Sequence, residues 1–454
     1  MGIRQRLTEP VDAASLAVFR MAFGALLLVL VLRYFEHGWI SEYFLQPKHL
    51  FKYWGFGWVR PLPGVGMYVV FGVMAVCALG VALGYRYRTS VLGYGLLFAY
   101  QHLLDKTHYL NHYYLVACVC GLMACLPLAA TWSLDARRGR APGADLVPTY
   151  ALWALRAQLG LVYVFGGLAK LNEDWLLRAE PLRFWLQRKS ELWLLGPLAS
   201  QAWLGFSMSW AGAAFDLCIV PLLLARKTRR FAFVALFGFH LATAQLFSIG
   251  MFPYLMMAGS LLFAEPNWPR RLLSRLGVSS ARVRPVWTSA PTPRLALPVL
   301  GLYFALQLVL PLRHWLYPGD ARWTEQGFRF SWSVMVMEKN GSVDFRVLEP
   351  QTGRVFHVAP SEYFTPYQVA MMAPQPDMVQ EAARVVAQDF RSRGVAEPKV
   401  FVDAYASLNG RAMQRLIDPS VDLSRAPDGL AAKPWILPLT PRPQESLAVA
   451  RSME

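Results

Sequence analysis

Long apolar stretches are the feature that most limits what this chain can fold into. A helix that crosses a lipid bilayer needs about 20 mostly apolar residues. Nine stretches approach this length: residues 14–34, 64–84, 89–104, 112–130, 149–170, 200–225, 229–247, 249–264 and 295–312. The eighth is short and follows the seventh almost directly, so these two are either full spans or a re-entrant hairpin. The sequence therefore predicts a polytopic α-helical membrane protein with about nine transmembrane helices.

The overall composition agrees with a membrane protein and excludes two other classes. Hydrophobic residues make up 55% of the 454 residues and charged residues 16%, whereas soluble domains contain roughly 45–50% and 25%. A chain this apolar is not disordered, because disordered segments combine low hydrophobicity with high charge. All five cysteines lie within the apolar stretches, where we expect packing thiols and no disulfide framework.

The distribution of basic residues predicts how the chain is oriented in the membrane. The formal net charge is +16 at pH 7, and a strongly basic balance is also found in proteins that bind nucleic acid. Here, however, arginine and lysine gather in alternate loops, as in residues 226–230 between the sixth and seventh stretches. Cytoplasmic loops of membrane proteins carry such an excess. We therefore expect a multi-pass integral membrane protein with a cytoplasmic N-terminus and no nucleic-acid partner.

An odd number of spans places the C-terminal part of the chain on the outer side. We therefore expect a transmembrane helical domain, residues 1–312, which carries the active site, and a small extracytoplasmic α+β domain, residues 313–454. In the second domain, apolar patterning predicts strands over 327–337, 342–348, 353–358 and 398–404 and a helix over 376–393. The tail after Pro434 is rich in proline and predicted to be extended.

Three polar residues recur at every seventh position in the fifth apolar stretch: Arg156, Tyr163 and Lys170. Seven residues are nearly two helical turns, so these side chains share one face. Ionisable groups are costly inside a membrane and usually face the bundle interior. We expect Arg156 to pair with a carbonyl or an acid. Lys170, at the outer end, either anchors the helix by reaching the interface or acts as a functional base.

Histidines from other stretches reach the same depth as Lys170. His112 begins the fourth stretch, His240 lies in the outer half of the seventh, and His314 directly follows the ninth. Tryptophan, tyrosine and phenylalanine are frequent around them, which suits a flat apolar ring. A lysine in such a pocket loses the hydration of its charged form, which favours the neutral amine that can act as a base. The sequence thus predicts an outer pocket for an apolar ligand.

A metal site is the alternative interpretation of the histidines in this region. His108 and His112 are four residues apart and would share one helical face. Structural and catalytic metal sites need three or four ligands, and no further ligand or HExxH motif lies nearby. We therefore expect an interfacial aromatic belt with hydrogen-bonded histidines and no metal.

Five stretches agree in order and spacing with one known family over residues 10–440. They are residues 13–20, 104–112, 167–175, 245–252 and 415–422, and the fourth, QLFSIGMF, is an unbroken eight-residue match. In these stretches the chain resembles the vitamin K-dependent gamma-glutamyl carboxylases. The resemblance implies an enzyme that converts vitamin K hydroquinone, a lipid-soluble quinol, to its 2,3-epoxide with O2. This oxidation supplies the base that removes a γ-proton from a glutamate of a peptide or protein substrate, which then takes up CO2.

The resemblance also implies roles for particular residues. The base lysine of the family corresponds to Lys170, and the histidine linked to the carboxylation step corresponds to His112, beside Asn111. The residues expected to line the vitamin K pocket are His240, Gln245, His314, Tyr163 and Arg156. Two alternatives stay open at the level of sequence. One is a quinol epoxidase that fixes no CO2 or modifies a different acceptor, and the other is a non-enzymatic membrane protein that binds quinone or lipid.

Overall fold

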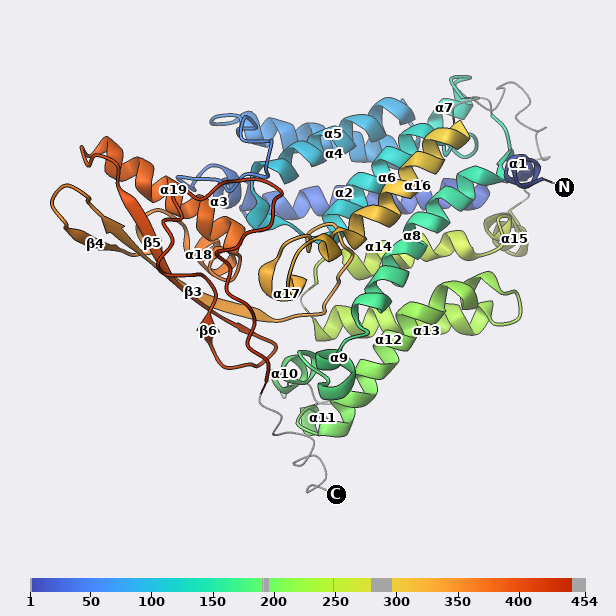
Figure 1. The fold of residues 1–454 in the computed structure, drawn as a ribbon. Coiled ribbons are helices and arrows are strands. Elements are labelled where there is room, and N and C mark those ends of the chain that lie inside the picture. The colour runs from blue at the N-terminus through green and yellow to red at the C-terminus, as the bar shows by residue number, and fades with distance from the viewer. Residues whose placement is uncertain are drawn as a thin grey trace.

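Helices account for most of the structure, a computed structural model that describes residues 2–141, 143–189, 191, 196–247, 249–278 and 296–442 (Figure 1). Each predicted apolar stretch contains a helix. These helices are α2 (Ala14–Glu36), α4 (Gly66–Leu83), α5 (Tyr87–Leu104), α6 (Asn111–Cys125), α8 (Thr149–Ala169), α12 (Ala202–Leu224), α13 (Arg229–Leu246), α14 (Phe252–Ser260) with η2 (Leu261–Phe263), and α16 (Ala296–Leu312).

Five of the described helices are long and apolar enough to cross a membrane. They are α2, α4, α8, α12 and the continuous helix that joins α16 to residue 316. The helices α6 and α14–η2 are apolar but shorter, and α5 and α13 are of sufficient length without being among the five. A membrane protein is therefore confirmed in outline, whereas the predicted count of nine spans is not.

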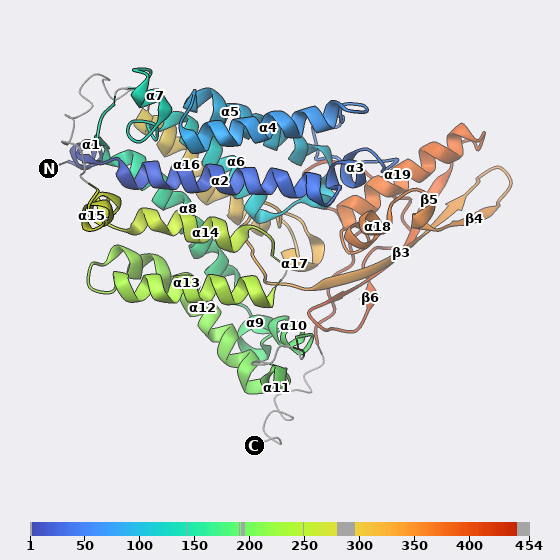
Figure 2. The same cartoon turned by 180° about the vertical axis from the view of Figure 1, so that it is seen from behind.

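Short elements connect the long helices. They are α1 (Ile3–Thr8), α3 (Trp39–Phe44), η1 (Lys106–His108), α7 (Leu134–Arg137), α9 (Glu173–Arg178), α10 (Leu182–Gln187), α11 (Gly196–Ala199), α15 (Trp268–Arg275), η3 (Arg313–Leu316) and α17 (Ala321–Thr324). An antiparallel pair of strands, β1 (Pro10–Asp12) and β2 (Leu146–Pro148), lies at the end of the bundle that carries α1 and α15 (Figures 1 and 2).

Glycine and arginine allow the long helices to approach closely. A Cβ atom on Gly24 of α2 would lie 2.4 Å from the backbone nitrogen of Ala82, so only glycine permits this contact with α4. The neighbouring Arg20 is fully buried. Its guanidinium donates to the carbonyls of Val81 at 2.8 Å and Leu128 at 3.1 Å, as well as to those of Ala82 and Trp132. Buried carbonyls without partners would destabilise the bundle, and Arg20 satisfies four of them.

A four-stranded antiparallel sheet forms the C-terminal domain, with the strands in the order β4 (Val355–Val358), β3 (Lys339–Leu348), β5 (Lys399–Leu408) and β6 (Gln414–Arg415). Alternate residues of β5 are buried, as expected of a sheet with one covered face. The helix α19 (Pro376–Ser392) packs against β3 and β5, while η4 (Pro360–Glu362) and α18 (Pro366–Met372) precede it. The predicted strands over 342–348, 353–358 and 398–404 and the helix over 376–393 are confirmed.

The predicted strand over 327–337 is wrong. Phe330, Trp332 and Met335 have φ angles of 63°, 58° and 53°, which are left-handed values that non-glycine residues adopt rarely and that interrupt an extended strand. Trp332 is fully buried within the core of the helical domain. The apolar pattern of residues 328–335, which we call the insertion loop, therefore reflects burial between helices and not one face of a sheet.

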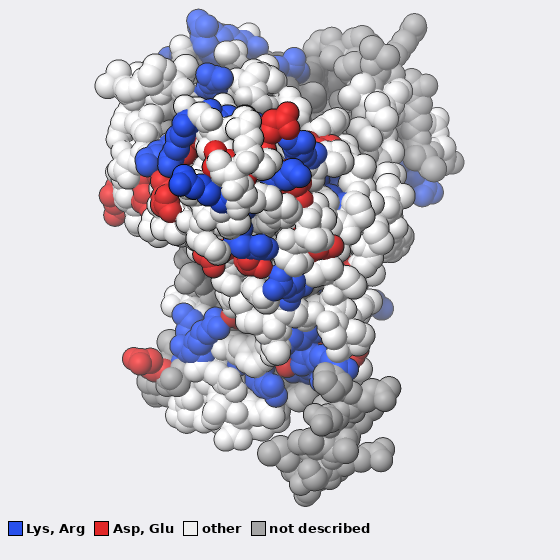
Figure 3. All heavy atoms as spheres, turned by 60° about the vertical axis from the view of Figure 1, so that its left-hand side comes forward, with Lys and Arg blue, Asp and Glu red and all other residues white. Residues whose placement is uncertain are grey.

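Ion pairs connect the C-terminal domain to the helical domain. Asp174, just after α8, accepts hydrogen bonds from Arg411 at 2.8 and 2.9 Å and from Asn409 at 3.0 Å. On the other side, Lys106 contacts Asp377 at 3.1 Å and Glu381 at 2.9 Å. The end of the molecule that comes forward in Figure 3 shows basic and acidic side chains interspersed. The domain lies at the end of the bundle opposite α1 and α15 (Figures 1 and 2).

Candidate active site

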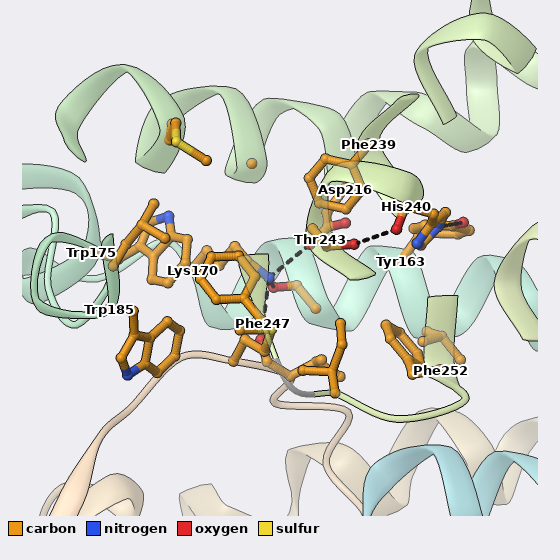
Figure 4. A pocket seen from close by; sticks show the side chains of 18 residues that line it. Tyr163, Lys170, Trp175, Trp185, Asp216, Phe239, His240, Thr243, Phe247 and Phe252 are labelled. Atoms are coloured by element: carbon orange, nitrogen blue, oxygen red, sulfur yellow. Dashed lines mark hydrogen bonds and ion pairs between the residues drawn. The ribbon is translucent and has the colours of Figure 1, made fainter. Parts of the chain in front are cut away.

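Lys170 is held as a buried cation between two helices and the insertion loop. It caps the C-terminus of α8 and is 6% exposed. Its Nζ atom donates to Asp216 Oδ2 of α12 at 2.7 Å (Figure 4). Further hydrogen bonds run to the carbonyls of Gly166 at 3.2 Å and Val334 at 3.3 Å. All three donor positions of the ammonium are thus used, and its charge is balanced by one buried carboxylate.

Small residues bring the two helices of this ion pair together. A Cβ atom on Gly167 would lie 2.8 Å from the side chain of Leu217 and 3.1 Å from its backbone nitrogen. Helices separate when a bulkier residue stands at such a position. Gly167 therefore sets the distance between α8 and α12 and, with it, the contact between Lys170 and Asp216.

A second polar pair lies nearly two helical turns further into the bundle. The Tyr163 hydroxyl is 2.8 Å from His240 Nε2, and both residues are buried. The other ring nitrogen, His240 Nδ1, is buried and has no hydrogen-bond partner among the described residues. A buried polar atom without a partner calls for an explanation. A ligand with an oxygen atom at this place would satisfy it.

These groups line a cavity, which we call the Lys170 cavity. Its walls come from α8, α12, α13, the α9–α10 segment and the insertion loop (Figure 4). Its aromatic side chains are Tyr163, Trp175, Trp185, Phe239, Phe247 and Phe252. Ligand pockets are typically apolar with a few fixed polar groups. The lining fits a flat apolar ring that carries oxygen atoms toward Lys170 and His240.

A second cavity, the His112 cavity, adjoins the first. Asn111 and His112 at the start of α6 line it, together with Arg33 of α2. Four residues line both cavities and form the wall between them: Ile249, Phe252, Val334 and Met335. The Phe252 ring lies 6.2 Å from the ring of His112 on one side and 6.2 Å from that of His240 on the other. Two chambers therefore meet at a thin apolar partition.

The insertion loop is fixed by polar side chains from α6 and the turn before it. The Asn111 side-chain amide donates to the Ser333 carbonyl at 3.2 Å, and its oxygen accepts from the Tyr109 hydroxyl at 2.9 Å. Tyr109 in turn accepts from the backbone N–H of Phe330 at 2.7 Å. Asn111 thus holds the loop whose Val334 carbonyl contacts Lys170.

The structure brings together some of the residues singled out in the sequence and separates others. Lys170, Tyr163 and His240 line one cavity, and Asn111 and His112 line its neighbour. Three other residues lie outside both cavities: Arg156, Gln245 and His314. The Arg156 guanidinium donates to the carbonyls of Leu262 at 2.8 Å and Ala264 at 3.1 Å, which is the carbonyl pairing expected of it.

Gln245 and His314 are also engaged elsewhere. Gln245 is exposed on α13. His314 bonds through Nδ1 to the Pro311 carbonyl at 2.8 Å, and its backbone packs against Gly327, where a Cβ atom would lie 2.6 Å from His314 Cα. In this structure His314 thus supports the chain that leads into the insertion loop.

Asp216 contacts Lys170 and is not among the residues singled out in the sequence. It is a single carboxylate in the otherwise apolar stretch 200–225. Ionisable residues within spans are costly and mark functional sites by default, so this signal was present in the sequence. Its partner, however, is 46 positions away, and only the packing of α8 against α12 shows that the two charges meet.

Comparison with known proteins assigns the two halves of the chain. Residues 8–268 match the family model of the HTTM domain. Residues 292–442 match that of the lumenal domain of the vitamin K-dependent gamma-carboxylase. The chain belongs to the vitamin K-dependent gamma-carboxylase family. No solved structure matches it. The apolar helices and the second match indicate that this chain is a membrane protein with a lumenal domain.

Proposed function

We propose that this carboxylase-family protein oxygenates the hydroquinone of vitamin K and couples the oxidation to γ-carboxylation of a peptide glutamate. The observation that supports this most directly is the buried Lys170–Asp216 pair, which faces a flat aromatic cavity next to the His112 cavity. When bound, the reduced quinol together with O2 supplies the strong base that removal of a γ-proton requires, and CO2 supplies the new carboxyl group.

Lys170 is proposed to accept the proton of a quinol hydroxyl. For this the amine must first be neutral, and Asp216, at 2.7 Å, can take up its proton directly. In a site of low dielectric a neutral amine beside a neutral carboxylic acid competes well with the ion pair, because neither charge has to be desolvated. Asp216 therefore stores the proton while Lys170 acts, and the hydrogen bonds to Gly166 and Val334 keep Nζ in place.

His240 and Tyr163 are proposed to orient the same ring. The Tyr163 hydroxyl fixes the His240 imidazole through Nε2, which leaves Nδ1 to meet an oxygen of the bound quinol. Phe239, Phe247 and Phe252 surround this position and keep water away. Exclusion of water matters because water would quench a base strong enough to remove a γ-proton.

His112 and Asn111 are proposed to serve the glutamate side of the partition. His112 has no ring hydrogen bond to another described residue and is 9% exposed, so it can contact the glutamyl side chain. Asn111 acts mainly through the insertion loop that it holds. The N-terminus is proposed to be cytoplasmic, with residues 1–312 as the membrane domain and residues 313–454 outside.

A single assay tests the proposed function. The purified protein in nanodiscs receives reduced vitamin K, a short glutamate peptide and ¹⁴C-bicarbonate, and epoxide and peptide label are followed together. We expect both products, loss of both in Lys170→Ala, and loss of label with residual epoxide in His112→Ala. Epoxide without label in the parent protein would indicate a quinol epoxidase, and neither product in folded protein would indicate a binding protein.

A further inference from the structure

We propose that Arg33 binds the carboxylate of the substrate glutamate in the His112 cavity and selects glutamate over neutral residues. This inference rests on the proposed carboxylase function and assigns the acceptor side of the same site. It concerns a residue of α2 that lies outside both the Lys170 cavity and the stretches that suggested the family.

Arg33 is a half-buried cation with no acidic partner. It lines the His112 cavity, and its guanidinium lies over the ring of Trp39, 5.5 Å from the centroid. Within the part of the chain that the structure describes it forms no ion pair, unlike Arg270, which pairs with Asp12 at 3.0 Å. A guanidinium held against an aromatic face and left without a carboxylate is well placed to receive one from a ligand.

The position of Arg33 suits the chemistry of the acceptor. Arg33 and His112 line the same cavity, so both can contact one bound group. Loss of the γ-proton breaks a C–H bond, leaves its electron pair on the carbon beside the carboxylate, and passes the proton to the base formed in the quinol reaction. The pair then forms the bond to the carbon of CO2. A bidentate guanidinium offsets the negative charge that builds up on this side chain.

An outer hollow links the His112 cavity to the surface near the C-terminal domain. Its lining includes Glu42, Gln46 and Thr365, and it shares Tyr43, His108 and Tyr367 with the His112 cavity. The rings of Tyr43, His108 and Tyr367 stack on one another there, with centroid distances of 4.1 Å for His108–Tyr43, 4.9 Å for His108–Tyr367 and 5.7 Å for Tyr43–Tyr367.

This stack joins the helical domain to α18, so a peptide that approaches from the C-terminal domain can insert one side chain past it. The glutamyl carboxylate would then meet Arg33, while an apolar quinol occupies the Lys170 cavity on the other side of Phe252.

Peptide binding without quinol tests this assignment. Fluorescence anisotropy of a labelled peptide, with either glutamate or glutamine at the acceptor position, is measured on the full chain in nanodiscs. We expect the parent protein to bind the glutamate peptide at least tenfold more tightly. Arg33→Gln should remove this preference, because a charged hydrogen bond is typically worth about a factor of 10 to 100 in affinity. The exposed Arg60 provides the matched control, and Arg60→Gln should keep the full preference.

Each outcome decides the proposal. Full preference for glutamate in folded Arg33→Gln overturns it, as does equal binding of the two peptides by the parent protein. If Arg33→Gln does not fold, Arg33→Lys decides, since it keeps the charge without the bidentate geometry: a preference reduced about three- to tenfold supports the assignment, and an unchanged preference overturns it. Epoxide formation by the parent protein is measured in parallel, so a failure of the proposed function is seen separately from a failure of Arg33.

Discussion

At the scale of single residues, the main feature is that the buried lysine is one half of an ion pair. Asp216 lies 2.7 Å from the Lys170 amine, so the proposed proton transfer would involve this carboxylate directly. The carboxylate also stays close to Gly166, where a Cβ atom would lie 3.5 Å from Asp216 Oδ2. The Asp216 carboxylate therefore lies between Lys170 and the wall of the cavity.

Asp216→Asn tests this role. The amide keeps the shape and can accept a hydrogen bond from Lys170, but it cannot take up a proton. We expect quinol epoxidation to fall about 10²- to 10⁴-fold, the usual range for loss of a proton-transfer group, and the thermal midpoint to fall as well, because Lys170 loses the buried carboxylate that balances its charge. The exposed Asp344 gives the control, and Asp344→Asn should retain activity. An Asp216→Asn enzyme of normal rate would show that the carboxylate serves only to anchor Lys170.

At the scale of elements, the contact between α8 and α12 decides whether the site forms. Two glycines of α8 face α12 with different clearances. A Cβ atom on Gly160 would meet Val220 at 3.7 Å, an ordinary contact, whereas one on Gly167 would meet Leu217 at 2.8 Å. The tight contact is one turn from Lys170, so it controls the part of α12 that carries Asp216.

This difference predicts opposite results for two similar changes. We expect Gly167→Ala to cost about 1–3 kcal/mol of unfolding free energy through overpacking and to lower epoxidation by displacing Asp216. Gly160→Ala should change the unfolding free energy by no more than about 0.5 kcal/mol and the epoxidation rate by no more than about twofold. Thermal unfolding in nanodiscs and the epoxide assay measure the two effects. Equal behaviour of the two variants would contradict the idea that the Gly167 contact sets the geometry of the pair.

At the scale of the whole molecule, buried ion pairs connect the two domains at their interface. Burial alone would raise the pKa of Asp377, but the charges of Arg329 and Lys106 outweigh it and hold that pKa below its ordinary value of 3.8. The pKa of Glu381 is likewise lowered, since hydrogen bonds from His49 and the charge of Lys106 outweigh its burial. Both acids thus favour the docked state when they are ionised.

The sign of these shifts predicts how docking responds to acid. An acid with a depressed pKa contributes its stabilisation above its unfolded value and loses it as the pH falls toward the folded value. Asp105 behaves in the opposite way, because burial raises its pKa to about 6. Its contribution to stability is present at low pH and is lost as the pH rises through that value. We expect the thermal midpoint to decrease as the pH is lowered below about 4.5. Asp377→Asn should be less stable at pH 7 and show a shallower acid loss, and an identical pH profile would contradict this.

The orientation in the membrane can be tested by labelling. Ser342 lies exposed on β3, and Cys125 and Cys218 are also exposed, so Ser342→Cys is placed in a chain whose own cysteines are changed to serine. If the C-terminal domain is extracytoplasmic, an impermeant maleimide should label this cysteine in intact cells. Labelling only after lysis would show that the domain faces the cytoplasm.

The sequence by itself determined the large divisions of this protein. Apolar stretches of this length set a helical membrane part, because a helix satisfies its own backbone groups in lipid, and the alternation of apolar residues predicted β3, β4 and β5 of the C-terminal domain. Local spacing also placed Tyr163 and Lys170 on one face of α8. The two domain matches agree with the family that the sequence resembles.

Only the tertiary structure decided which distant residues meet. The Lys170–Asp216 pair spans 46 positions, and the partition at Phe252 is built from two segments far apart in the chain. The insertion loop misled the strand prediction because its apolar residues are buried among helices in left-handed conformations. Periodicity reports which side chains are buried, but the partner that buries them is set by packing over the whole chain.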